Sequence, residues 1–138
     1  MKKLIAISIL FFTTTAYATT SEKWVKVSTD EYGETFVNSS HIKSVAGHPS
    51  VIEYGYKYIY TYGVPSLQIA PRGYIQAIHQ INCKEQTKAT IKSQRFKPNG
   101  KAIDTDTPFS TVYFEPIYDS HTDLMKVYKY VCKAKNKI

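Results

Sequence analysis

The sequence predicts an α+β fold, a single small domain in which an antiparallel β-sheet carries a C-terminal α-helix packed on it. Short runs of alternating apolar and polar residues, separated by turn-forming residues, are typical of antiparallel strands. One apolar stripe with helical period lies near the C-terminus. With 138 residues, the chain is long enough for one hydrophobic core and too short for two full domains.

Five segments are expected to form the strands. They cover residues 23–28, 33–38, 51–62, 73–84 and 87–97. Turn residues follow the last of them at Pro98 and Gly100, because proline fixes φ and glycine accepts positive φ. Alternation places one set of side chains on a common face of the fourth strand: Ile75, Ala77, His79, Ile81 and Cys83. On the fifth strand, the inward residues are expected to be Ala89 and Ile91.

Two helical segments are expected. Asn38, Ser39 and Ser40 precede Ile42, and polar residues of this kind favour a short helical turn. The main helix lies at the C-terminus, where Ser120 and Asp123 form an S-x-x-D capping box. The apolar stripe behind this cap predicts the face that packs on the sheet and consists of Leu124, Val127, Tyr128 and Val131, with Cys132 at the end of the helix.

Every second residue between positions 54 and 62 is a tyrosine: Tyr54, Tyr56, Tyr58, Tyr60 and Tyr62. In a regular strand all five project from one face. One interpretation is an aromatic binding surface, because tyrosine offers a large contact area at small entropic cost. The other interpretation is a core stripe beneath the helix. The opposite face carries Glu53, Gly55 and Lys57 and is expected to face solvent. We therefore expect at least half of the tyrosine stripe to belong to the core.

The N-terminus has the pattern of a secretory signal peptide, residues 1–18. A basic start at Lys2 and Lys3 precedes a short apolar run, and a small-x-small motif ends at Ala18. We expect cleavage between Ala18 and Thr19, which leaves one exported domain, residues 19–138. The apolar run is too short for a permanent membrane span, and no cysteine follows it to accept a lipid anchor.

The two cysteines, Cys83 and Cys132, are expected to form a disulfide, because export brings thiols into an oxidising compartment. His79 lies four residues before Cys83, so a nucleophile and base pair or two metal ligands are alternatives. A catalytic thiol would leave Cys132 unexplained, and zinc would need a further ligand without any familiar spacing. His79 is then expected on the half-buried face of a strand, hydrogen-bonded through one nitrogen.

No catalytic motif stands out, and we expect neither enzymatic activity, nor a cofactor, nor a metal site. Glycine-rich phosphate loops, G-x-S-x-G and H-E-x-x-H are absent from the sequence. Asp104 and Asp106 in one turn are candidates for holding a cation, although solvated carboxylates are the more common case. A small secreted hydrolase that uses a histidine and a glutamate as base and acid is the least favoured alternative.

The formal charge of the chain is +7, and removal of Lys2 and Lys3 with the signal peptide lowers it by two. A basic protein of this kind favours anionic surfaces as partners. We expect the charge to act through Lys88, Lys92 and Arg95, with Lys88 and Lys92 on one strand face. Together with Tyr56 and Tyr58 of the tyrosine stripe, these residues are the candidate binding residues.

Several segments, in this order, resemble the surface-adhesin protein E family of bacteria. They are Trp24 at the start of a short strand, "FVNSSHIK", "INCK" at the end of a long strand, "RFKPNGKAI" and "SHTDLMKVYKYVC". The resemblance extends from Trp24 to Cys132. It implies an antiparallel sheet with a flanking C-terminal helix, and an outer-membrane adhesin that binds host matrix and serum proteins such as laminin, vitronectin and plasminogen.

The expected function is therefore an exported, non-enzymatic adhesin-like module, located at the cell surface, secreted or in the periplasm. Its expected partners are host extracellular-matrix or serum proteins, with a second copy of the chain as a further candidate and no nucleic acid. The alternative is a periplasmic accessory or binding protein of the cell envelope.

Overall fold

The computed structural model describes residues 21–136. The predicted signal peptide and its cleavage site between Ala18 and Thr19 lie outside the described residues. No helix within residues 21–136 is long and apolar enough to cross a membrane.

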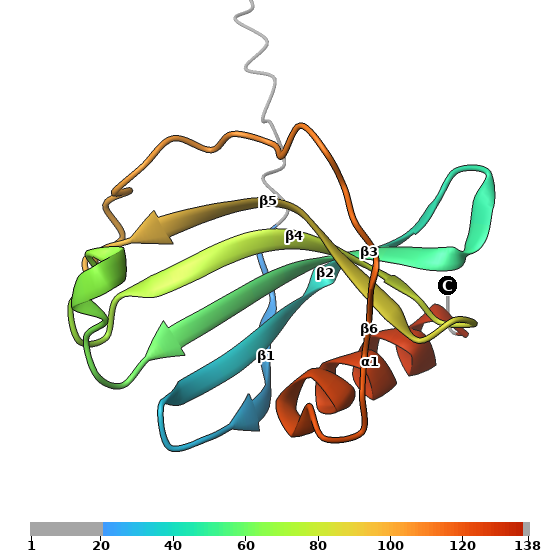
Figure 1. Cartoon of the computed structure of the whole chain (residues 1–138), viewed down its shortest axis with the longest axis horizontal. Helices are drawn as coiled ribbons and strands as arrows, with labels where there is room; N and C mark the ends of the chain where they lie inside the picture. The colour runs from blue at the N-terminus through green and yellow to red at the C-terminus, as the bar shows by residue number, and fades with distance from the viewer. Residues whose placement is uncertain (1–20, 137–138) are drawn as a thin grey trace, which may run out of the picture.

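The described chain is a sheet of six strands with one α-helix, so the predicted α+β class is confirmed (Figure 1). All neighbouring strands are antiparallel and follow one another in chain order. The strands are β1 (Trp24–Thr29), β2 (Gly33–Val45), β3 (His48–Tyr60), β4 (Tyr74–Asn82), β5 (Thr87–Phe96) and β6 (Glu115–Pro116). A short 3-10 helix, η1 (Pro65–Leu67), lies between β3 and β4, and α1 (Thr122–Lys135) ends the described chain.

The helical turn expected after Asn38 is wrong, because β2 continues to Val45 and forms a long hairpin with β3. The register shifts between Asn38 and Ile42, so the three polar residues between them bulge out of the ladder. The Asn38 side chain stabilises this bulge. Its Oδ1 accepts hydrogen bonds from the backbone N–H and the hydroxyl of Ser40, at 3.1 and 2.6 Å. The polar cluster that suggested a helix cap therefore supports a bulge instead.

The start of α1 also differs from the prediction. The helix begins at Thr122 with His121 in the N-cap position, and no side chain caps it. Asp123 accepts a hydrogen bond from the Ser28 hydroxyl of β1, so this carboxylate fastens the helix to the sheet and the expected capping box with Ser120 does not form. The helix continues beyond Cys132 to Lys135.

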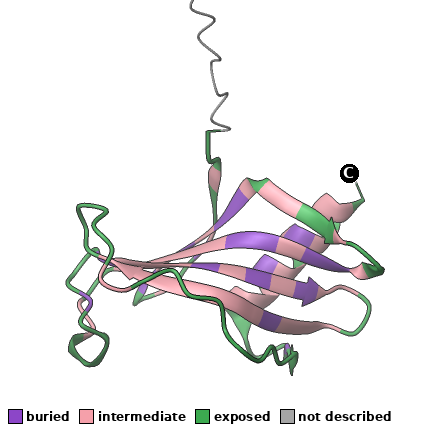
Figure 2. Cartoon of the chain, turned by 90° about the horizontal axis from the view of Figure 1, so that it is seen from above, coloured by how far each residue is buried: buried purple, intermediate pink, exposed green. Residues whose placement is uncertain are grey.

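The apolar stripe of α1 packs on the sheet as predicted. Val127 and Val131 are buried, with Leu124 and Tyr128 beside them. Their partners in the core are Val37, Ile52, Tyr54, Ile81 and Ile117. Buried positions gather on the part of the sheet next to the helix, whereas the other part is mostly half-buried or exposed (Figure 2). The helix thus covers only about half of one sheet face.

The predicted disulfide is confirmed, because Cys83 and Cys132 are bonded and their Cα atoms lie 5.7 Å apart. The bond ties the last turns of α1 to the end of β4. One turn earlier in the helix, the Tyr128 hydroxyl donates a hydrogen bond of 2.8 Å to the Cys83 carbonyl. Together they fix α1 at this end of the sheet.

Residues 101–117, here called the edge segment, run antiparallel to β5 along its free edge. Backbone hydrogen bonds join the two at intervals, from Ile103 N–H to the Arg95 carbonyl and from Phe109 N–H to the Ile91 carbonyl, at 2.8 and 2.9 Å. Near its end, β6 pairs with the first residues of β5. The segment therefore protects an edge that would otherwise expose unpaired backbone groups.

The disulfide generates the first prediction. Replacing both cysteines, Cys83→Ala with Cys132→Ala, should lower the free energy of unfolding by about 4 kcal/mol, because a loop of this length is no longer closed in the unfolded chain. Urea denaturation followed by circular dichroism measures the loss. Thiol titration of the unreduced, denatured wild type should find no free thiol, and two titratable thiols would contradict the bond.

The ion pair between Arg95 and Asp104 generates the second prediction. Arg95→Gln removes the 2.8 Å contact between Nε and the Asp104 carboxylate and a 2.6 Å hydrogen bond to the Leu67 carbonyl. We expect faster hydrogen exchange at the Ile103 amide and a stability loss of about 1 kcal/mol. Lys101→Gln is the matched control, because Lys101 makes no ion pair among the described residues. Equal exchange in both variants would show that the pair does not hold the edge segment.

Candidate binding groove

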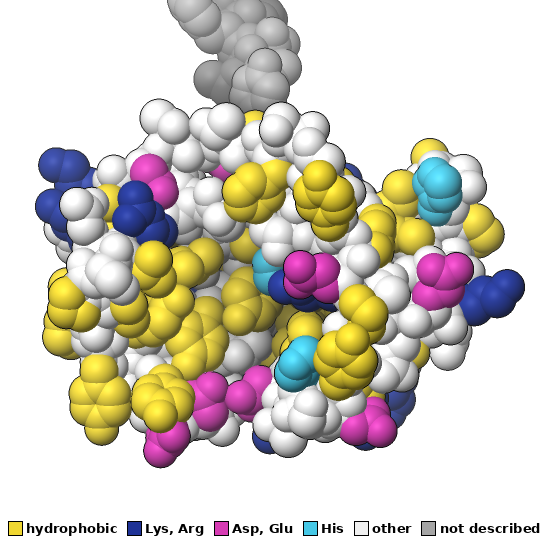
Figure 3. All heavy atoms as spheres, in the orientation of Figure 1, with side chains coloured by type: hydrophobic (Ala, Val, Ile, Leu, Met, Phe, Trp, Pro, Cys, Tyr) yellow, Lys and Arg dark blue, Asp and Glu magenta, His cyan; other side chains and the backbone are white. Residues whose placement is uncertain are grey.

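A groove lies on the face of the sheet that carries α1, between the helix and the edge segment. Its open part has a volume of about 560 Å³. A smaller end of about 220 Å³ continues beneath the helix at Leu124 and Val127. Four side chains line both parts and make the groove continuous: Tyr56, Tyr58, His79 and Lys88. Figure 3 shows this face hollowed, with hydrophobic side chains on its floor and rim.

The tyrosine stripe of β3 is core at one end and surface at the other. Tyr54 is fully buried in the core cluster, and Tyr56 packs against that cluster. Tyr58 and Tyr60 are half-buried in the floor of the open groove, and Tyr62, beyond the strand, is 66% exposed. The stripe is therefore core in one half, as expected, and accessible to solvent in the other, because the helix covers only one half. An aromatic binding surface stays a prediction for the accessible half.

Asp30 holds the open end of the groove in place. Its carboxylate accepts hydrogen bonds from the Tyr58 hydroxyl at 3.0 Å and from the backbone N–H groups of Tyr32 and Gly33. Burial alone would raise the pKa of Asp30, but these three donors outweigh it and keep the pKa below its ordinary value. Burial and the adjacent Asp30 raise the pKa of Tyr58, so its hydroxyl stays protonated and remains a donor.

His79 forms the inner wall of the groove. Its Nδ1 lies 3.2 Å from the Tyr54 hydroxyl, and its ring stacks on Tyr56 with centroids 4.5 Å apart. Burial, together with the charge of Lys88, lowers the pKa of His79 well below 6.5, so the ring is neutral at physiological pH. The prediction that His79 is hydrogen-bonded through one nitrogen is confirmed. The side chain is almost completely buried, whereas a half-buried position was predicted.

The expectation that Lys88 and Lys92 share a strand face is wrong. Lys88 lies opposite Ile81 and lines the groove, whereas Lys92 lies opposite Ile78 and lines a hollow on the other face. The cause is the register shift between Ile78 and His79, which places an extra residue, Ile91, in β5. A bulge of one residue reverses the side-chain alternation that the spacing of four predicted.

The other basic residues expected to attract a partner are engaged within the molecule. Lys92 Nζ lies 2.7 Å from the Asp106 carboxylate, and Arg95 Nε lies 2.8 Å from that of Asp104. The two aspartates considered as cation ligands therefore face basic side chains. Among the described residues, no group of three or more potential metal-ligating side chains is found.

The edge segment, together with Tyr118 just after it, adds a row of exposed apolar side chains that the sequence interpretation missed. Tyr113 is 72% exposed, and four neighbours are also exposed: Phe109, Val112, Phe114 and Tyr118. Phe109 of the edge segment is hydrogen-bonded to Ile91, and Glu115 pairs with Lys88. The edge segment has more residues between these two points than β5 has, so it bows outward (Figure 1). The signal was present as "FSTVYF", an aromatic run without the alternation of a strand. We call these five residues the aromatic rim.

A histidine and glutamate pair, as considered for a hydrolase, exists on the opposite face. His41 Nε2 lies 3.1 Å from Glu53 Oε1 across the β2–β3 hairpin. Glu53 also accepts from Lys43 at 3.2 Å and from Gln80 at 3.3 Å. The carboxylate is thus shared among three partners on the sheet surface, an arrangement typical of cross-strand pairs that stabilise a hairpin.

No known protein family and no curated protein matches the sequence. Among solved structures, the chain is similar to protein E of Haemophilus influenzae, with a TM-score of 0.57 and 12% sequence identity. The superposition covers 83% of this chain and 87% of protein E. The chain therefore has a protein E-like fold, and at this identity the likeness is one of fold alone.

The buried imidazole generates the third prediction. Below pH 6.5 the unfolded chain binds a proton at His79 while the folded chain does not, so stability should fall with decreasing pH by up to about 1.4 kcal/mol per pH unit. His79→Gln keeps a hydrogen-bond partner for Tyr54 and should remove this part of the slope. His48→Gln, at an exposed position, should retain it. Urea denaturation between pH 7.5 and 5.5 measures the slopes, and equal slopes in all three proteins would refute the assignment.

Proposed function

We propose that this chain is an exported, non-enzymatic adhesin-like module that binds a protein partner along the groove and the aromatic rim. The observation that carries the proposal is the partly covered tyrosine stripe with the aromatic rim beside it. Together they place aromatic side chains from β3 and the edge segment around one hollow. Exposed apolar patches of this kind are typical of protein interaction sites. Tyrosine and phenylalanine are also enriched at such interfaces.

The chemistry of the groove supports binding rather than catalysis. Two of its titratable groups are engaged with tyrosines, since Asp30 accepts from Tyr58, and His79 is neutral and bonded to Tyr54. Tyrosines whose hydroxyls are held by neighbours lose little conformational entropy when a partner packs on them. The partner class follows from the resemblance to the surface-adhesin protein E family, supported by the protein E-like fold: a host extracellular-matrix or serum protein.

The disulfide supports export, because such bonds persist in oxidising compartments. Location at the cell surface distinguishes the adhesin from the alternative, a periplasmic accessory protein of the envelope. Protease added to intact cells should degrade a surface protein, whereas a periplasmic protein should be degraded only after the outer membrane is opened. Protection in intact cells, together with no binding of the purified protein to host matrix or serum proteins, would overturn the proposal.

The aromatic rim generates the fourth prediction. Tyr113→Ser with Phe114→Ser should weaken binding to laminin, vitronectin or plasminogen about tenfold or more, mainly through a faster dissociation rate, because buried aromatic anchors dominate such interfaces. Surface plasmon resonance measures the rates. Val25→Ser is the matched control, since Val25 is an exposed apolar residue of β1 at the opposite edge of the sheet. Unchanged melting temperatures would show that both variants remain folded.

The salt dependence of binding distinguishes an interface made by the aromatic rim from one made by basic side chains. Because Lys92 and Arg95 are paired with carboxylates, binding should change little between 0.1 and 1 M salt, where the Debye length falls from about 10 to about 3 Å. Replacing Lys92 and Arg95 with glutamine should then leave the association rate nearly unchanged. A steep loss of affinity with salt, and slower association of this double variant, would favour the basic-face model instead.

A further inference from the structure

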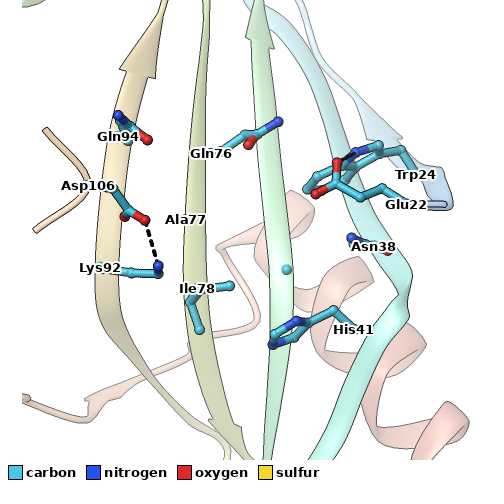
Figure 4. A pocket seen from close by; sticks show the side chains of 11 residues that line it. Glu22, Trp24, Asn38, His41, Gln76, Ala77, Ile78, Lys92, Gln94 and Asp106 are labelled. Carbon is cyan, nitrogen blue, oxygen red and sulfur yellow. Dashed lines mark hydrogen bonds and ion pairs between the residues drawn. The ribbon is translucent and has the colours of Figure 1, made fainter. Parts of the chain in front are cut away.

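We infer that the hollow on the outer face of the sheet, opposite α1 and the groove, binds one neutral sugar ring. The hollow has a volume of about 220 Å³ and is lined by residues of the first five strands and the edge segment, together with Glu22 just ahead of β1 (Figure 4). Nothing in the proposed protein-binding function uses this face. The inference is therefore independent of that proposal.

The strand register builds the hollow as a row across the sheet. Trp24 lies opposite Asn38, Asn38 opposite Gly55, Gly55 opposite Ile78, and Ile78 opposite Lys92. Gly55 leaves the floor open at the centre of this row. A Cβ atom there would lie 2.9 Å from the Asn38 Cβ, so a larger residue would both fill the hollow and displace Asn38.

Asn38 supplies a hydrogen-bond donor without a partner. Its Oδ1 is occupied by the bulge, accepting from the Ser40 N–H and from the Lys23 N–H at 3.3 Å. No hydrogen bond of its Nδ2 is found within residues 21–136, although Asn38 is only 6% exposed. In Figure 4 the amide nitrogen points toward the centre of the hollow. Among the described residues, only Thr87 Oγ1 is a fully buried side-chain polar atom without a partner, so Asn38 Nδ2 is open to the hollow and can donate to a ligand acceptor.

Two further amide side chains extend the polar lining. Gln76 makes no side-chain hydrogen bond within the described residues, so both ends of its amide are free to contact a ligand. Gln94 donates through Nε2 to the Asp104 carbonyl at 2.7 Å, which orients the side chain and leaves Oε1 as an acceptor. Donors and acceptors that line the same hollow match a ligand whose hydroxyl groups both donate and accept.

Trp24 forms one end of the hollow and is held in place. Its Nε1 donates to Glu22 Oε2 at 3.0 Å, and the Lys57 ammonium lies 4.1 Å from the ring centroid. The cation and the hydrogen bond restrict the indole before any ligand arrives. An aromatic ring beside polar groups matches a sugar, whose ring presents apolar C–H groups on its faces and hydroxyls around its rim.

Charge and size select a small neutral ligand. The lining carboxylates are Glu22 and Asp106. Asp106 is paired with Lys92 at 2.7 Å, and the Lys57 ammonium over Trp24 interacts with the charge of Glu22, so no excess charge is available for a sulfate, a phosphate or a cation. The volume lies below the 300 Å³ or so at which pockets for drug-sized ligands begin. One ring therefore fits, and it belongs either to a free monosaccharide or to the end of a longer glycan.

The test uses Trp24 as its own reporter, since the chain has a single tryptophan. The purified exported protein is titrated with the methyl glycosides of glucose, galactose, mannose and N-acetylglucosamine, and with glucose 6-sulfate. Tryptophan fluorescence and ligand-observed NMR follow binding. We expect at least one neutral glycoside to bind, and the sulfated sugar to bind more weakly. A glycan array then shows whether the same ring binds more tightly at the end of a longer chain.

Three variants locate the binding. Asn38→Asp keeps the acceptor that supports the bulge and removes the donor, and Gln76→Ala removes a free amide; each should weaken binding about tenfold. Gln80→Ala is the matched control, because Gln80 lies on the same face of β4 but outside the hollow, and it should bind like the wild type. If the Asn38→Asp variant does not fold, the Gln76→Ala variant still tests the inference. Absence of any binding by neutral glycosides, preference for the sulfated sugar, or equal affinity of Gln76→Ala and Gln80→Ala would overturn the inference.

Discussion

The attachment of α1 to one end of the sheet is the constraint on which the rest of the structure depends. The bond between Cys83 and Cys132 and the hydrogen bond from Tyr128 to the Cys83 carbonyl hold its last turns, and Asp123 fastens its first turn to β1. A helix held in this way covers the part of the sheet around Ile52 and Tyr54 and leaves the remainder uncovered. The same attachment thus creates both the core and the open groove.

A sheet with one helix has a second face, and bulges decide what each face carries. The bulge after Asn38 occupies the oxygen of the amide that lies over Gly55, and the shift at Ile91 sends Lys88 to the groove and Lys92 to the outer face. Because one extra residue reverses the alternation, neighbouring lysines of one strand serve different surfaces. The molecule therefore offers two separate candidate sites, an aromatic groove on one face and a polar hollow on the other.

The edge segment links both faces. Its backbone closes the free edge of β5, its aspartates pair with Lys92 and Arg95, its Phe109 lines the groove, and its outward bow exposes Tyr113. A single irregular segment thus pairs two of the basic side chains expected to attract a partner and provides apolar contact area beside them. This combination of paired charge and aromatic surface is the physical reason to favour an interface with weak salt dependence.

The sequence by itself determined the class of the fold, the approximate positions of five of the six strands, the packing face of α1 and the pairing of Cys83 with Cys132. Alternation, helical period and the count of cysteines can be read without knowledge of tertiary contacts. Only the tertiary structure decided where the tyrosine stripe ceases to be core, since burial depends on how far a distant helix reaches. It also decided that the polar residues after Asn38 bulge from a strand, and that Asp123 bonds Ser28 rather than capping its own helix. Asp123 had a local partner and a distant one, and packing of the whole chain brought the distant Ser28 close enough to compete. The residues after Asn38 stay in a strand because β2 pairs with β3, which is also a tertiary contact.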